Sequence, residues 1–198
     1  RSDFSIAAVN AKQSIVVAGP TSNVERFADE HNEKGIASKQ LKTSHAFHSK
    51  MMDEALEPFA KVFDGIELQI PKIPILSTVT GQWLKDSEAL DINYWVNHLR
   101  ETVNFSGAIE NLIATEHTLL LEVGPGAALS AFAKQNGASV ALAGLKISKN
   151  GEEELHNFLQ LIGNLWLNGK DVDWNRLSPN PTQKILSLPN YAYQKKRY

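Results

Sequence analysis

The sequence contains no cysteine, so disulfide bonds, thiolate zinc sites and cysteine nucleophiles are excluded. It also lacks any apolar run near the roughly 20 residues that a membrane-spanning helix needs. Its start, Arg1–Ser2–Asp3–Phe4, is not followed by the apolar segment of a signal peptide. We therefore predict a protein with no membrane contact and a cytoplasmic location.

Neither sign of charge is in large excess, because 20 Lys and Arg residues face 22 Asp and Glu residues and the net charge is -2. A nucleic-acid partner usually requires a basic excess, so we predict none. Hydrophobic residues make up 42% and charged residues 21%, which is typical of globular proteins. A length of 198 residues allows one domain or two small ones with a shared core.

The first forty residues have the pattern of a small α+β unit. Residues 4–9 and the β-branched run at 14–18 are predicted strands, with a Gly-Pro turn after the second. Apolar residues at helical spacing predict a helix over 21–34. Residues 36–41 are predicted to form a third strand.

The middle of the chain alternates between helical and extended patterns. An amphipathic helix is predicted over 49–63, with Ser49 as its N-cap. A strand is predicted at 73–79, a short helix capped by Asp91 follows it, and another helix is expected over 105–113.

The last third indicates an α/β unit with a parallel sheet. The apolar run 118–123 is typical of a strand that is buried on both faces. A glycine-rich turn, a helix at 127–135 and a strand at 139–145 follow it. A long helix is predicted over 152–168 with five apolar residues facing inward, namely Leu155, Phe158, Leu159, Ile162 and Leu165. Residues 186–198 are predicted to be an extended linker.

Two histidines, His45 and His48, stand three residues apart next to the predicted helix at Ser49. They can be loop residues without a role, or a metal-binding pair that would need further ligands. The third interpretation is a general base. The positive end of a helix dipole disfavours the imidazolium, and a neutral imidazole can take the proton of a serine nucleophile.

Several segments together resemble the acyltransferase domains of type I modular polyketide synthases. They occur in the order of that family and cover nearly the whole chain. The matching segments are AAVNAKQSIVVAGP (7–20), LKTSHAFHSKMMD (41–53), YWVNHLRETVNF (94–105), LLLEVGPGAALS (119–130), DVDW (171–174) and LPNYAYQKKRY (188–198).

The resemblance implies an α/β fold made of a ferredoxin-like α+β subdomain and the second half of an α/β-hydrolase-like acyltransferase core. Residues 1–43 would be most of the inserted ferredoxin-like subdomain. Residues 44–145 would be the C-terminal half of the core, and 146–198 the terminal helix and an extended C-terminal linker.

The resemblance also implies site residues. The family's catalytic histidine matches His48, and a backbone carbonyl at the position matching His98 accepts its imidazole N–H. The tetrapeptide at 45–48, with His45 and Phe47, is similar to the form that selects malonyl over methylmalonyl. Phe47 can fill the space that an α-methyl group needs, which gives a bias of about 1–3 kcal/mol.

Three further residues are candidates for the substrate channel. Asn10 matches a position that lines the acyl and coenzyme A channel, although an asparagine at the end of a strand is as often a turn residue. Lys39 and Lys42 can meet coenzyme A phosphates, or form a solvated strand edge. The substrate would be malonyl-CoA with no bound cofactor, and the acceptor the phosphopantetheine of an acyl carrier protein.

The family's nucleophile is a serine in a GHSxG turn, and no GxSxG occurs in the 198 residues. We therefore expect a separate N-terminal half to carry that serine, and no transacylation by this chain alone. A different possibility is a docking or scaffold element, in which the tyrosine-rich tail packs against the neighbouring ketosynthase domain.

Overall fold

The computed structural model describes residues 4–114, 119–145, 151–177, 187–192 and 196. It begins with an antiparallel pair, β1 (Ser5–Ala11) and β2 (Ser14–Ala18), followed by α1 (Thr21–Asn32). Both predicted strands and the helix are confirmed. Phe4 packs edge-on against Phe27 of α1, with ring centroids 4.7 Å apart, so the helix is tied to the start of the pair.

The third predicted strand, at 36–41, is wrong. These residues have no regular structure, and both Ile36 and Leu41 are more than half exposed, at 56% and 55%. A strand requires a hydrogen-bonded neighbour, and the described part of the chain offers this segment none.

A loop over 44–49 leads into a short 3-10 turn, η1 (Lys50–Met52), and α2 (Asp53–Lys61). Ser49 caps this helical segment as predicted, because its hydroxyl accepts the Met51 N–H at 3.2 Å. The Ser49 side chain is buried and also donates to the Ala46 carbonyl at 2.6 Å, which holds the loop in a tight turn.

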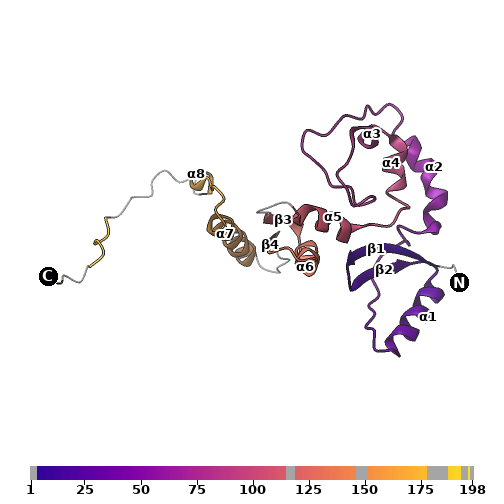
Figure 1. Ribbon diagram of the computed structural model, residues 1–198, viewed down its shortest axis with the longest axis horizontal. Helices are drawn as coiled ribbons and strands as arrows, with labels where there is room; N and C mark the ends of the chain where they lie inside the picture. Colours follow the sequence, from indigo (N-terminus) through magenta and orange to yellow (C-terminus); the bar gives the residue numbers. More distant parts are fainter. Residues whose placement is uncertain (1–3, 115–118, 146–150, 178–186, 193–195, 197–198) are drawn as a thin grey trace.

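The strand predicted at 73–79 is also wrong, since only Leu76 pairs, in an isolated bridge with Trp83. Two short helices follow, α3 (Asp86–Ala89) and α4 (Ile92–Asn97). Asp91 caps α4 as predicted, accepting the Asn93 N–H at 2.9 Å. In Figure 1, α4 lies beside α2.

The next segment forms α5 (Phe105–Ile113), β3 (Leu119–Pro125), α6 (Ala128–Gln135) and β4 (Val140–Leu145). The two strands are parallel, which confirms the predicted α/β arrangement. A small core lies between α5, α6 and this sheet. Its members are Ile109, Ala133, Ala138 and Ala141, with Phe105, Ile113 and Leu120 packed against them.

Glu122 fixes the turn between β3 and α6. Its carboxylate accepts the backbone N–H of Ser130 at 2.8 Å and of Leu129 at 3.3 Å, at the positive end of α6. Burial raises the pKa of Glu122, but the hydrogen bonds from Ser130 and Leu129 together outweigh it and leave the pKa below its ordinary value. Glu122 thus joins β3 to the start of α6 across the glycine-rich turn.

The first strand is joined directly to the segment that follows α4. Val9 donates to the Val103 carbonyl at 2.8 Å, and Val103 donates back to Ala7 at 2.9 Å. Further along, the Asn136 side chain donates to the Asn10 carbonyl at 2.7 Å. These bonds cross the boundary predicted at residue 43, so β1 holds the chain at Val103, shortly after the turn that follows α4.

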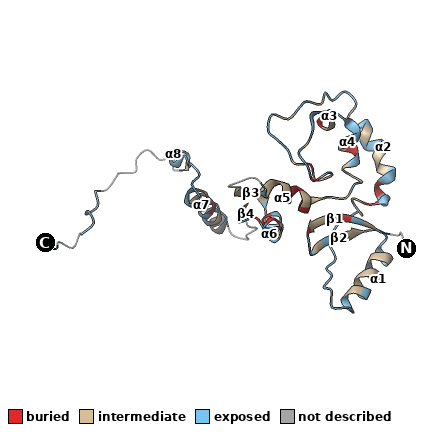
Figure 2. Ribbon diagram, in the orientation of Figure 1, coloured by how far each residue is buried: buried red, intermediate tan, exposed pale blue. Residues whose placement is uncertain are grey.

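Exposed residues occur along the whole chain, α7 included (Figure 2), and long apolar side chains are among them. The predicted inward face of α7 (Gly151–Leu167) is wrong for three residues, because Leu155, Phe158 and Leu159 are 60%, 37% and 49% exposed. Leu161, which was not among them, is the buried residue, and Gly144 of β4 is its neighbour. Leu155, Phe158 and Leu159 therefore remain exposed although α7 packs against β4.

Strand β3 shows the same departure from expectation. Leu121 is 42% exposed and Val123 87% exposed, so this strand is not buried on both faces as predicted. A last short helix, α8 (Trp174–Leu177), precedes the tail, of which residues 187–192 have no regular structure. Within the described ranges, no helix has the length and hydropathy needed to cross a membrane.

Candidate active site around His48

His48 lies in the loop between the N-terminal unit and η1, and its backbone is unusual. Its φ is +58°, and within the described ranges it is the one residue other than glycine with a positive φ. This conformation costs an L-residue on the order of 1–3 kcal/mol and persists where the surroundings hold it. Such strain often marks a functional position.

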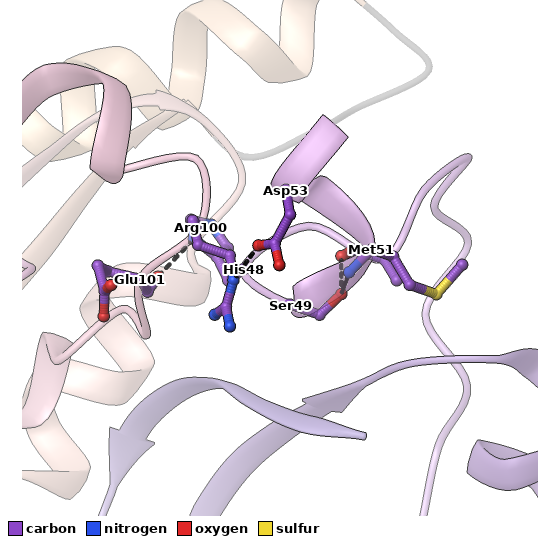
Figure 3. A network of polar contacts seen from close by, with 7 residues as sticks. His48, Ser49, Met51, Asp53, Arg100 and Glu101 are labelled. Carbon is purple, nitrogen blue, oxygen red and sulfur yellow. Dashed lines mark hydrogen bonds and ion pairs between the residues drawn. The ribbon is translucent and has the colours of Figure 1, made fainter. Parts of the chain in front are cut away.

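Two backbone carbonyls hold His48, and Figure 3 shows the contact with Glu101. The His48 N–H donates to Leu99 at 3.1 Å, and Nδ1 lies 2.9 Å from the Glu101 oxygen. A carbonyl only accepts, so Nδ1 must carry the proton in this bond. In the neutral ring the lone pair is then on Nε2, which is the arrangement that a general base requires.

The predicted role of the His98 carbonyl is corrected by this geometry, because the acceptor of the His48 imidazole is Glu101. His98 ends α4 with helical angles, φ -53° and ψ -31°, so its carbonyl still follows the helix. A hydrogen-bonded turn continues from α4 through Glu101, and the carbonyls of Leu99 and Glu101 are the ones that reach His48. The prediction therefore placed the acceptor in the correct segment, 94–105, but at the wrong residue.

The His98 side chain has an environment that sequence reasoning did not anticipate. It stacks on Trp95 with ring centroids 5.7 Å apart and meets the edge of Tyr94 at 4.8 Å. Its Nε2 is buried, without a hydrogen-bond partner. Burial, and then repulsion from His48, lower the pKa of His98 below its ordinary value of 6.5.

This lowered pKa predicts a pH-dependent stability. As the pH falls below about 6.5, the unfolded chain binds a proton at His98 before the folded chain does, so folding stability falls until the folded pKa is passed. Replacing His98 with phenylalanine keeps an aromatic ring and should remove this part of the pH dependence. Urea midpoints of both proteins at pH 7.5 and 5 would test it, and equal losses in both would contradict it.

His45 and Phe47 lie on the same loop but have few partners. His45 Nδ1 is 2.9 Å from the Ser44 hydroxyl, and its ring centroid is 5.9 Å from that of Phe47. Phe47 is 42% exposed, so part of its ring is accessible to solvent or to a ligand. No group of three His, Cys, Asp or Glu side chains that would complete a metal site occurs in the part of the chain that the structure describes.

The remaining predicted site residues are not brought to His48 by any described contact. The backbone carbonyl of Asn10, near the end of β1, accepts a hydrogen bond from the Asn136 side chain. Lys39 and Lys42 lie in the exposed segment 36–43 and make no described hydrogen bond or ion pair. Their roles in substrate binding stay predictions.

Asp53 and Arg100 were missed by sequence reasoning. Arg100 Nε lies 2.6 Å from Asp53 Oδ1, so the two join the start of α2 to the segment that holds His48. They are 47 positions apart in the chain, and no local pattern pairs them.

A family profile described as an acyl transferase domain matches residues 1–172. The chain belongs to this family. The polyketide synthase GfsA of Streptomyces halstedii is 33% identical over 200 residues, which are 99% of this chain and 3% of GfsA. The chain therefore spans a small part of such relatives.

Solved acyltransferase domains have the same fold. The acyltransferase domain of SpnD, in complex with 2-(pent-4-yn-1-yl)malonyl, is similar over 84% of this chain and 42% of its own, with 34% identity and a TM-score of 0.79. The acyltransferase domain from the second module of the salinomycin polyketide synthase is similar over 95% of this chain and 44% of its own, with 33% identity and a TM-score of 0.80. The chain is thus an acyltransferase-family segment that spans less than half of either solved domain.

Proposed function

We propose that this chain supplies the histidine base of a polyketide synthase acyltransferase that moves a malonyl group from malonyl-CoA to an acyl carrier protein. The observation that carries the proposal is the bond from His48 Nδ1 to the Glu101 carbonyl, at 2.9 Å. It fixes the ring orientation and leaves Nε2 to accept a proton without help from an aspartate.

The nucleophile belongs to a partner half with a GHSxG serine. Exposed apolar side chains of α7 and β3 support such a half, because a large exposed apolar surface normally has a partner.

The reaction has two acyl transfers with one proton carrier. His48 Nε2 takes the serine proton while the serine oxygen attacks the thioester carbon of malonyl-CoA. The C–S bond breaks, and the imidazolium gives its proton to the coenzyme A thiolate. The phosphopantetheine thiol of the carrier protein then loses its proton to Nε2 and attacks the malonyl ester, and the proton returns to the serine oxygen.

We propose malonyl as the acyl group because Phe47, next to His48 on the same loop, can fill the space that an α-methyl group would need. The similar SpnD domain was solved with a substituted malonyl, so a malonyl thioester is the expected substrate class. One methyl group in an apolar site changes affinity by about 1–3 kcal/mol, so malonyl should be preferred over methylmalonyl by roughly 10- to 200-fold.

Intact-mass measurement tests the proposed function. The chain, mixed with the serine-bearing half, is incubated with equal malonyl-CoA and methylmalonyl-CoA and then denatured. We expect an adduct of about 86 Da on the partner half, with little of the heavier methylmalonyl adduct. Absence of any adduct on the complex would contradict the function, and a predominant methylmalonyl adduct would contradict only the selectivity.

Docking to a ketosynthase is a second candidate, favoured by the tail. Leu188 is 77% exposed and Tyr191 79% exposed, as expected of side chains that pack on another surface. Binding of this chain to a ketosynthase without the serine-bearing half would support it, whereas binding that requires that half would count against it.

A further inference from the structure

The Asp53–Arg100 ion pair lies beside the loop of His48 (Figure 3). Arg100 Nε and Asp53 Oδ1 are 2.6 Å apart. The Arg100 side chain is only 25% exposed, and that of Asp53, the first residue of α2, is 57% exposed. The two side chains therefore meet at the edge of the molecule, with the arginine stem packed inward.

The position of the pair is more informative than its strength. Arg100 stands between Leu99 and Glu101, whose carbonyls bind the His48 backbone and ring. Asp53 lies five residues after His48 in the chain. The pair therefore completes a closed circuit of contacts. This circuit runs from His48 along the chain to Asp53, across the ion pair to Arg100, and back to His48 through the two carbonyls.

The unusual backbone conformation of His48 persists only while its contacts hold it in place. Its φ of +58° is a conformation that an L-residue leaves when its contacts loosen. Both contacts that hold it come from the turn after α4, whose own backbone hydrogen bonds run back to Val96 and Asn97 and do not reach the helix that follows His48. The link to α2 is the described side-chain contact that ties this turn to the helix following His48.

We propose that the Asp53–Arg100 pair is a positioning element that keeps the Leu99 and Glu101 carbonyls in place around His48. This rests on the proposed function, in which His48 is the base. A partly exposed ion pair contributes little to overall stability, so the role is visible in the chemical step rather than in unfolding.

Kinetics of the acyltransferase assembled from this chain and the serine-bearing half test the role. Asp53→Asn should lower kcat for malonyl transfer about tenfold, because a small displacement of a reacting group slows the chemistry. KM for malonyl-CoA should stay within about twofold, since neither residue is placed at the substrate. The double exchange Asp53→Arg with Arg100→Asp should restore most of the lost kcat.

Glu57→Gln is the matched control. It breaks the Lys61–Glu57 pair, which has a 2.9 Å contact on the same helix, and should leave kcat unchanged. If Asp53→Asn does not fold, Arg100→Lys serves instead, because lysine keeps the charge but loses the fixed geometry of Nε.

The outcomes distinguish the positioning role of the Asp53–Arg100 pair from the proposed function of His48 as the base. If His48→Gln abolishes transfer while Asp53→Asn and Arg100→Lys leave kcat unchanged, the positioning role is wrong and the function stands. If His48→Gln leaves transfer intact, the proposed function itself is wrong. A kcat loss that the exchanged pair does not restore, with a parallel loss of thermal stability, would make the pair merely structural.

The ¹⁵N shifts of the His48 ring give a readout that does not depend on turnover. The wild-type ring should hold its proton on Nδ1, and Asp53→Asn should raise the fraction with the proton on Nε2. Unchanged tautomer fractions would overturn the proposal.

Discussion

Replacing His48 with glutamine should lower kcat for malonyl transfer by about three orders of magnitude, the contribution typical of a general base. Glutamine keeps a side chain of similar length and can still donate to the Glu101 carbonyl, but it cannot accept the serine proton at neutral pH. Transfer to the carrier protein, followed with radiolabelled malonyl-CoA, measures the effect. The fall should appear in both half-reactions, because the same nitrogen carries the proton in each.

His45→Gln is the matched control for this variant. His45 is on the same loop, three residues away, and its described polar contact is with the neighbouring Ser44 hydroxyl. Its replacement should change kcat by less than about tenfold, because no proton moves through it. Equal losses in the two variants would show that the loop tolerates no substitution, and would remove the assignment of the base to His48.

Gly81→Ala should unfold the protein at a temperature roughly 10 °C lower, corresponding to a loss of about 3 kcal/mol. Gly81 has a φ of +70°, and a Cβ there would lie 2.7 Å from the Asn104 amide nitrogen. The strained backbone costs about 1–2 kcal/mol and the overpacking about 1–3 kcal/mol. Asn104 would also be pushed from its position as the N-cap of α5, where it accepts the Gly107 N–H at 3.0 Å. Thermal denaturation followed by circular dichroism measures the change.

Gly65→Ala separates the two causes. Its φ of +80° is similar, but a Cβ there would meet nothing within 4 Å. It should therefore show only the backbone cost of about 1–2 kcal/mol. If both variants lose the same stability, then the close approach between Gly81 and Asn104 has no energetic consequence.

The elements that were predicted correctly depend on patterns among neighbouring residues in the sequence. Ser49 and Asp91 cap the helical segments that follow them, since an N-cap needs only its own side chain and the next two or three N–H groups. The parallel pair β3 and β4, with α6 between them, follows from apolar runs separated by a helical period and a glycine-rich turn.

The elements that were predicted wrongly depend on partners distant in the chain. Residues 36–41 and 73–79 have the composition of strands, but a strand exists only where another backbone pairs with it, and the described chain has none at either place beyond one bridge at Leu76. The apolar face of α7 was expected to point inward because the periodicity identifies a face but not what covers it.

What the sequence by itself determined is the identity of the parts: the order of the family's segments, the histidine that is the candidate base, and the absence of a GxSxG serine from these 198 residues. What only the tertiary structure decided is how those parts meet: that the Glu101 carbonyl rather than that of His98 accepts the imidazole hydrogen bond, that His48 takes a positive φ, and that Asp53 faces Arg100. The physical reason is one of range. Residue types and their spacing along one element can be seen in a short stretch of sequence. A hydrogen bond between positions 53 residues apart depends instead on how two turns pack, to within about an ångström.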